Sequence, residues 1–374
     1  MKENNKVKYI TKNNNNNSVN EIKINNILLK KRNFKIRMHY LDLLRIVSAF
    51  SVIIIHVSAD YYYNLKINHQ YWKITFYFNA IARFGVPVFF MISGTIFLSR
   101  NIPLRIILVK YNLRILIHLI VWSFIYSIYN IKLSKNNIDK IIKKFFSGHF
   151  HLWYLHSTIE LYMISPFLRE LVKTNLLKDL IKLSFIFSFL LRNLIDLKLY
   201  YPKILTTIFD NIYSKFNFEK FKGNIFYFML GYYINSKKDF GIIILNLIYF
   251  LGILGFLFTT LILYNICIIN HKKLLLYFNN FNLNILFYST GIFVFFKEKF
   301  NNLSLNKKTI LKRISNYTFG IYLIHPLILD KIVNTMNFSY FILLIPLKSI
   351  ITFILSFLIC VIFKNIPFFG EYIV

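Results

Sequence analysis

Two basic side chains, Arg45 and His56, stand eleven residues apart in a predominantly apolar segment. In a helix of about 100° per residue, they lie within ~20° of the same face and ~16 Å apart along the axis. A guanidinium binds phosphate or carboxylate, and a neutral imidazole accepts a proton from a hydroxyl. Asp42, three residues before Arg45, is close enough to pair with it. This face predicts anion binding at one end and proton transfer at the other. The structural alternative is a snorkelling Arg45 and a hydrogen-bonded His56.

Two further segments place polar side chains inside apolar runs. Arg83 lies in ARFGVPVFFMISG, and Tyr322 and His325 lie three residues apart in NYTFGIYLIHPLIL. Because a charge at the centre of a membrane helix costs roughly 2.5–3.5 kcal/mol, Arg83 is expected to face a cavity or a partner. All three residues are candidate catalytic or acceptor-binding groups. The structural alternative for both segments is a kinked packing helix with satisfied polar groups.

The segment HFHLWYLHSTIELY brings three histidines and an acid together. His156 and Glu160 share a helix face at a spacing of four, and Glu160 is a further candidate catalytic or acceptor-binding residue. His149 and His151 are predicted to lie at the outer membrane interface. The spacing of five from His151 to His156, and the lack of an HExxH order, argue against metal binding. No metal ligand is therefore assigned.

The composition of the chain defines the elements that must position these residues. The chain has 374 residues, of which 56% are hydrophobic and 19% aromatic, and its formal net charge is +31. With 16% charged residues and a mean hydropathy of +0.50, it cannot cover a soluble apolar core. Nucleic-acid binding would explain the charge but not the apolar content, so no nucleic-acid partner is expected. A bilayer explains both, because lipid solvates apolar faces and basic residues collect in loops.

Recurring apolar segments predict an all-α fold, a polytopic membrane helix bundle of about ten transmembrane helices. The expected spans lie near residues 40–60, 75–99, 104–129, 152–172, 178–198, 222–236, 241–264, 282–297, 314–331 and 340–363. The distribution of Lys and Arg between the loops favours cytoplasmic N- and C-termini in a multi-pass protein of the cell inner membrane.

Two parts of the chain are distinguished by composition. Residues 1–38 are polar, basic and low in complexity, and they predict a disordered cytoplasmic tail. Residues 39–374 carry the apolar segments and predict one membrane-embedded domain.

Taken together, the motifs resemble the acyltransferase-3 family of integral membrane proteins, especially its enterobacterial common antigen O-acetyltransferase branch. The resemblance runs from about Leu41 to Phe363. Its four matching segments, in the expected order, are LDLLRIVSAFSVIIIHVS, ARFGVPVFFMISGTIFL, HLWYLHSTIELYMISPFLREL and YTFGIYLIHPLIL.

The resemblance implies a ten-helix bundle that transfers an acyl group, usually acetyl, from cytoplasmic acyl-CoA to a glycan hydroxyl. It implies Arg45 and His56 as the essential pair. Acyl-CoA is then a co-substrate and no cofactor stays bound, while a glycan or lipid-linked saccharide and the membrane lipids are the partners. The family's Arg-x-x-Arg pair on the third helix is only half present, because KYNLR offers Tyr111 and Arg114. Lys110 is placed to supply the missing charge, so Lys110 and Arg114 are the candidate acyl-CoA ligands.

These residues permit two chemistries and leave two other classes of function open. His56 acts either as the general base on the acceptor hydroxyl or as a covalent carrier of the acyl group. A transporter or flippase of a lipid-linked glycan would use the same polar face without acyl transfer. A relative that keeps the fold without activity is the third reading, prompted by the missing arginine of the third helix.

Overall fold

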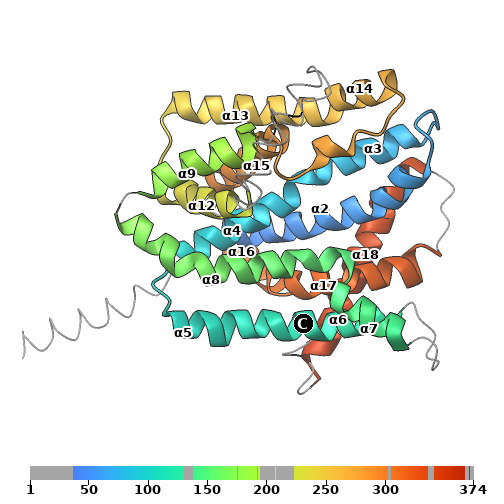
Figure 1. The fold of residues 1–374 in the computed structure, drawn as a ribbon, viewed down its shortest axis with the longest axis horizontal. Helices are drawn as coiled ribbons and strands as arrows, with labels where there is room; N and C mark the ends of the chain where they lie inside the picture. Colours follow the sequence, from blue (N-terminus) through green and yellow to red (C-terminus); the bar gives the residue numbers. More distant parts are fainter. Residues whose placement is uncertain are drawn as a thin grey trace, which may run out of the picture. The chain divides into compact units, whose positions relative to one another are not determined.

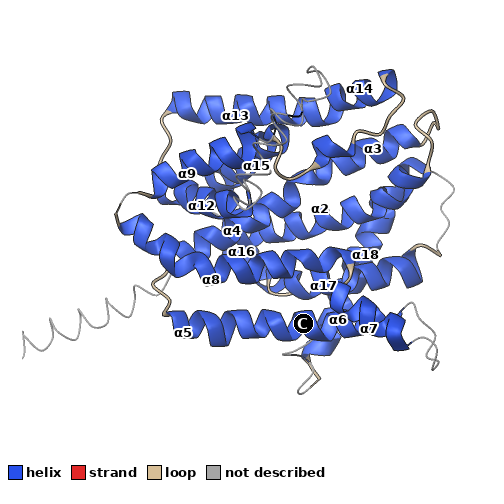
Figure 2. Cartoon of the chain, viewed as in Figure 1, coloured by secondary structure: helices blue, strands red, loops and turns tan. Residues whose placement is uncertain are grey.

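A computed structural model of the chain describes nearly all of the unit His39–Val374. The described residues are 37–129, 138–174, 176–191, 193, 207, 223–301, 305–335, 341–366 and 370. The predicted tail, residues 1–38, lies outside them except for its last two residues. Within the described ranges, every regular element is helical and no strand occurs (Figure 2). The all-α class expected from the sequence is therefore confirmed for this part of the chain.

The helices keep close to the apolar segments of the sequence. In chain order they are α2 His39–Asn64, α3 Trp72–Ile81, α4 Gly85–Leu98, α5 Leu104–Ile106, α6 Leu113–Tyr129, α7 Ile138–Ser147, α8 Trp153–Lys173, α9 Leu177–Phe185, α12 Gly223–Ser236, α13 Ile242–Leu257, α14 Leu263–Ile269, α15 Leu283–Phe300, α16 Leu305–Ser315, α17 Thr318–Ile328 and α18 Phe341–Lys364. Short 3₁₀-helical turns are η1 Ala82–Phe84, η4 Phe150–Leu152 and η9 Leu275–Phe278, and π-helical turns are η2 Ile107–Asn112, η5 Ile186–Leu190, η8 Phe258–Ile262 and η10 Leu329–Val333.

Four helical runs are long and apolar enough to cross a membrane. They are His39–Asn64, Trp72–Leu98, Ile242–Ile269 and Ile342–Lys364. By contrast, α12 has 14 residues and is about 21 Å long, less than the ~30 Å of a bilayer's hydrocarbon core. The structure thus shows a helical membrane protein. Length and composition alone account for four crossings within the described residues, fewer than the ten or so expected.

The helices of the unit lie alongside one another (Figure 1). The first helix, α2, is central and packs against α3, α4, α15, α16, α17 and α18. In the view of Figure 1, α13 and α14 form the upper edge and the continuous helix 104–129 the lower edge. Because α2 contacts so many neighbours, its polar side chains are brought close to residues from distant parts of the sequence.

Glycines allow α4 to pack directly on the backbone of its neighbours. A Cβ atom at Gly94 would overlap the carbonyl oxygen of Phe228 in α12, and one at Gly231 would overlap that of Met91. A Cβ at Gly85 would overlap the Ser51 hydroxyl of α2. Such close approach between helices depends on small residues at the contact. Because these glycines carry no Cβ, α4 packs directly against both α2 and α12.

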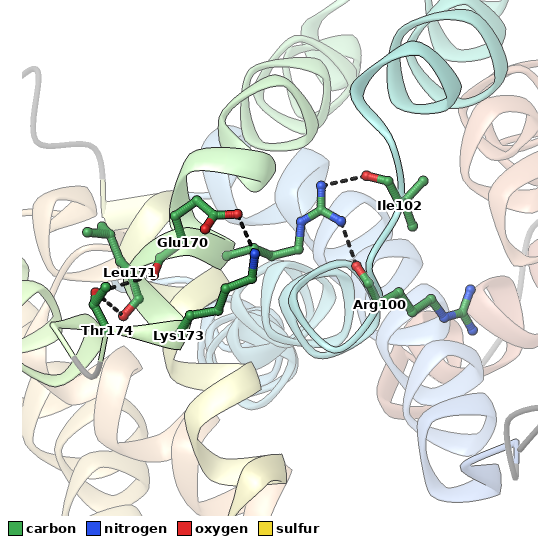
Figure 3. Close-up of polar contacts among 7 residues, drawn as sticks. Arg100, Ile102, Glu170, Leu171, Lys173 and Thr174 are labelled. Carbon is green, nitrogen blue, oxygen red and sulfur yellow. Dashed lines mark hydrogen bonds and ion pairs between the residues drawn. The ribbon is translucent and has the colours of Figure 1, made fainter.

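Arg169 of α8 holds the link between α4 and α5. Its guanidinium donates hydrogen bonds to the carbonyl oxygens of Arg100 and Ile102, at 2.7 and 2.6 Å (Figure 3). The neighbouring Lys173 and Glu170 form an exposed ion pair at 2.7 Å. Because Arg169 is buried, these bonds replace water at two chain carbonyls. They fix the start of helix 104–129 against α8.

The contact of α4 with α12 gives a prediction about stability. Gly94→Ala places a Cβ against backbone that cannot move away, so we expect a loss of roughly 1–3 kcal/mol and a lower melting temperature in detergent. Gly241→Ala is the matched control, because nothing lies within 4 Å of a Cβ built there. Thermal unfolding followed by circular dichroism measures both variants. Equal melting temperatures for both would contradict the packing described here.

Candidate functional site

The site begins at Asp42, an acid buried near the start of α2. Its carboxylate accepts a hydrogen bond of 2.8 Å from the Ser315 hydroxyl of α16. It also lies 3.6 Å from the Arg45 guanidinium and 3.5 Å from the His39 ring. The expected pairing of Asp42 with Arg45 is therefore confirmed. One buried acid thus orients Arg45 and ties α2 to α16.

Arg45 lines a cavity of about 370 Å³ inside the bundle. The cavity is lined by side chains of α2, α4, α8, α16, α17 and helix 104–129, together with Asn316 between α16 and α17. Its lining residues are Arg45, Val52, Val86, Phe89, Ile92, Ser93, Tyr111, Arg114, Ile115, Tyr154, Thr158, Tyr162, Ser315, Asn316, Thr318, Phe319 and Tyr322. Two guanidinium groups and several hydroxyls thus face a largely apolar space, as is usual for a small-molecule site.

Tyrosines form one wall of this cavity. The ring of Tyr162 stacks on Phe97 with centroids 3.7 Å apart, and Tyr111 packs edge-on against Phe97 at 5.0 Å. Tyr154 packs against Tyr322 at 5.4 Å. The Tyr111 side of this wall comes from the π-helical turn Ile107–Asn112, and such turns are frequent at functional sites. Stacking holds the rings, so their hydroxyls are fixed relative to the two arginines.

His56 belongs to a cluster of histidines beside the cavity. Its ring lies 5.2 Å from that of His325 in α17, and His325 lies 5.7 Å from His151 in η4. The Nδ1 atoms of His151 and His149 are 2.7 Å apart, within hydrogen-bond distance. Tyr322, which lines the cavity, donates its hydroxyl to the carbonyl oxygen of His151. The cluster and the cavity therefore share a wall.

The hydrogen bonding of His325 defines its tautomer. Its Nδ1 lies 2.7 Å from the carbonyl oxygen of Tyr322, and a carbonyl can only accept, so Nδ1 carries the proton. The Nε2 atom is then a proton acceptor, and it is buried with no hydrogen-bond partner among the described residues. The Nε2 of His151 is buried and without a partner in the same way. Two imidazoles of the cluster thus have unused nitrogen atoms inside the protein.

The outer side of the cluster is covered by the segment that follows α7. The ring of Phe150 lies 5.0 Å from His56 and is 61% exposed. His149 stacks on Tyr126 at 4.1 Å, and the Tyr126 hydroxyl donates to the Leu323 carbonyl at 2.8 Å. Burial lowers the pKa of His149 to about 4, with a smaller contribution from the positive charge of Lys144. His149 is therefore neutral at pH 7, and the exposed ring of Phe150 packs against the partly exposed His56.

Arg83 is held by an amide instead of an acid. Its Nε donates to the Asn79 side-chain oxygen at 2.9 Å, and its second NH2 group contacts the same oxygen. Asn79 in turn donates to the Ser58 hydroxyl of α2 at 2.9 Å. The guanidinium also lies 4.6 Å above the Phe278 ring. Arg83 is thus connected through Asn79 to Ser58, two residues beyond His56 in α2, and it does not line the cavity.

The structure separates the candidate residues of the sequence into four groups. Arg45, Arg114 and Tyr322 line the cavity. His56 and His325 belong to the histidine cluster, and Arg83 belongs to the network of Asn79. The remaining two, Lys110 and Glu160, are exposed and are not among the lining residues.

Sequence reasoning missed part of the site. Tyr154, Thr158 and Tyr162 line the cavity, and their spacing of four residues was a signal for one helix face pointing inward. The side chain of His151, which we expected at the outer membrane interface, is buried beside His325. Local sequence could not show this, since the partner lies more than 170 residues away. Among the described residues, no group of three His, Cys, Asp or Glu is placed to hold a metal ion.

Comparison with known proteins identifies the family. The family profile described as "Acyltransferase domain" matches residues 38–364, which is most of the chain. No curated protein and no solved structure matches the chain significantly. The matched range includes the cavity, the histidine cluster and the network of Arg83. The chain therefore belongs to the acyltransferase-3 family, and it is a membrane acyltransferase.

Proposed function

We propose that this protein is a membrane O-acyltransferase that moves an acetyl group from cytoplasmic acyl-CoA to a hydroxyl of a cell-surface or lipid-linked glycan. One observation carries the proposal: a cavity that contains Arg45 and Arg114 also reaches Tyr322, whose hydroxyl binds the backbone of the histidine cluster around His56. An anion site and a group able to accept a proton are thus next to each other. The likeness of the motifs to the enterobacterial common antigen branch suggests acetyl as the acyl group.

The arginines are suited to the phosphates of acyl-CoA. A guanidinium forms strong, charge-assisted hydrogen bonds with phosphate oxygens. A cavity of about 370 Å³ fits a ligand at the lower end of the drug-sized range, so it would hold the acylated arm while the nucleotide stays at the mouth. Arg45 is partly neutralised by Asp42, which leaves Arg114 as the stronger positive charge. Lys110, exposed on the same helix, would contact the nucleotide only outside the cavity.

In the proposed reaction, the acceptor hydroxyl attacks the thioester carbonyl while His56 takes the hydroxyl proton. The new ester C–O bond forms, the C–S bond breaks, and the proton then passes from His56 to the departing thiolate. Proton transfer of this kind typically contributes about 10²- to 10⁴-fold in rate. His325, with its unused Nε2, is placed to orient the His56 ring. The covalent alternative forms an acyl-His56 intermediate, which single-turnover trapping would reveal.

Acceptor access is proposed from the side of Phe150. That ring packs against the partly exposed His56 and comes from the turn after α7, at the opposite end of α2 from Arg45. Donor and acceptor would then approach His56 from opposite ends of the bundle.

We place the protein in the inner membrane with both termini cytoplasmic. In this arrangement, shorter helices such as α12 and α17 complete a bundle of about ten crossings around the four long helices.

The role of His56 gives the first test of function. In membranes supplied with labelled acetyl-CoA, His56→Ala should reduce O-acetylated glycan by about 10²-fold or more, because the general base is lost. His156→Ala is the matched control, since His156 is exposed on α8 and should leave the product unchanged. Wild-type activity in His56→Ala at normal protein levels would sink the catalytic assignment. Glycan translocation by the wild type without any acetylated product would favour a flippase.

A second test concerns the donor site. Arg114→Gln should raise the KM for acetyl-CoA by about tenfold, because a hydrogen bond to a charged group is worth ~1.5–3 kcal/mol. Lys110→Gln, on the same helix but outside the cavity, should change it much less. Initial rates at varied acetyl-CoA and saturating acceptor measure both values. A larger effect of Lys110→Gln would mean that the donor does not use the cavity.

A further inference from the structure

A second hollow lies on the outer side of the bundle, between α13 and α15. It is an apolar groove of about 470 Å³ that shares no lining residue with the cavity around Arg45. Tyr288 and Phe256 lie at one end of the groove, and Lys299 lies at the other. Among the described residues that line the groove, Lys299 is the only charged one. The groove thus combines a long apolar path with one positive charge at its end.

The groove exists because glycines bring the two helices together. A Cβ at Gly252 of α13 would lie 3.1 Å from the Cα of Gly291 in α15, so the backbones are almost in contact. Because glycine has no side chain, backbone atoms of Gly252 and Gly291 form the floor of the groove. Ile253 and Phe295 line it as well and are 58% and 43% exposed. The result is a depression with a backbone floor and apolar walls.

The groove faces the surroundings of the bundle. The helical run Ile242–Ile269 contains α13, and only 17% of its most apolar window is buried, the lowest share among the four candidate spans. Its mean hydropathy over that window is 2.4. In a bilayer, such a surface contacts lipid chains rather than protein. The groove is therefore open to the hydrocarbon region of the membrane.

The length of the groove fits one leaflet. From Tyr288 to Lys299 there are eleven residues along α15, which correspond to ~16 Å at 1.5 Å per residue. Half of a typical hydrocarbon core is about 15 Å. An acyl chain lying with one end beside Tyr288 would place its headgroup close to Lys299. The charge thus lies where a lipid phosphate would be.

Lys299 is available for a headgroup, unlike its neighbours. The Lys297 ammonium donates to the Lys237 carbonyl at 2.6 Å and lies 3.7 Å from Glu298. Lys299 is exposed, and no ion pair or hydrogen bond of its side chain is found within the described residues. A basic residue near an anionic membrane surface gains about 1 kcal/mol from it. This position therefore favours an anionic over a zwitterionic headgroup.

We infer that the groove between α13 and α15 binds one acyl chain of an anionic phospholipid, with the phosphate at Lys299. Shape, apolar lining, leaflet length and the terminal charge all fit this occupant. The inference depends on the membrane location and not on acyl transfer. If the groove binds no lipid, the proposed reaction is unaffected. If the protein transfers no acyl group, the proposed lipid site is unaffected.

The test is photolabelling of the full chain in vesicles. Phosphatidylglycerol with a diazirine in its acyl chain is cross-linked, and the labelled residues are located by mass spectrometry. The groove residues of α13 and α15 should carry more cross-linked label than the exposed apolar residues of the other helices. Ile253→Trp should abolish this excess by filling the groove, while Ile243→Trp should not, because Ile243 is 81% exposed on α13 and does not line the groove.

The charge is tested with a second lipid. The preference for phosphatidylglycerol over phosphatidylcholine should fall by about fivefold in Lys299→Gln, the equivalent of ~1 kcal/mol. Lys312→Gln, exposed on α16 and outside the groove, is the control and should keep the preference. Three results would overturn the inference. They are label spread evenly over all lipid-facing helices, competition by a polyisoprenyl phosphate but not by phospholipid, and cross-linking of the groove to a second copy of the chain.

Discussion

Polar groups inside an apolar bundle have no water to bind, and the site of this protein depends on how the bundle satisfies them. The Asp42 carboxylate is satisfied by Ser315 and by Arg45, the Tyr322 hydroxyl by the carbonyl of His151, and the Arg83 guanidinium largely by Asn79. The bonds of Asp42 with Ser315 and of Tyr322 with His151 also join elements far apart in the sequence. The same contacts that avoid buried, unpaired polar atoms therefore bring the candidate functional residues together. Within the described residues, the buried Nε2 atoms of His325 and His151 have no hydrogen-bond partner, and both rings belong to the cluster around His56.

Close helix packing gives this arrangement its precision. Gly85 and Gly94 let α4 rest on the backbones of α2 and α12, and Arg169 fixes the link from α4 to helix 104–129. These contacts define the walls that carry Ser93 and Arg114 into the cavity. On the outside, Gly252 and Gly291 produce the opposite result, a shallow apolar groove facing lipid. Close contacts at glycines thus contribute both to the cavity inside the bundle and to the groove on its outer side. Proteins in bilayers use small residues in this way because the lipid supplies little hydrophobic force between helices.

Much of the local structure could be predicted from the sequence. Apolar segments gave the helices, and the spacing of three gave the pair of Asp42 and Arg45. The partner of Arg83 was missed, although Asn79 precedes it by four residues, because an acid was sought instead of an amide. The local sequence pattern also could not predict which basic residues line the cavity. Arg114 faces the cavity and Lys110 does not, although both lie on the same continuous helix. The expected number of about ten membrane crossings stays a prediction, because length and composition alone identify four of them within the described residues.

The sequence by itself determined that the chain is a helical membrane protein and that its motifs resemble the acyltransferase-3 family. Both follow from information that is local: helical hydrogen bonds join residues four apart, and hydropathy is a property of each segment. Only the tertiary structure decided that His151, from the segment after α7, lies beside His325, and that Tyr154 and Tyr162 enclose the cavity of Arg45. Those neighbours depend on which faces of separate helices pack together. The closeness of that packing depends on glycine contacts between distant segments, which no periodicity within one helix records.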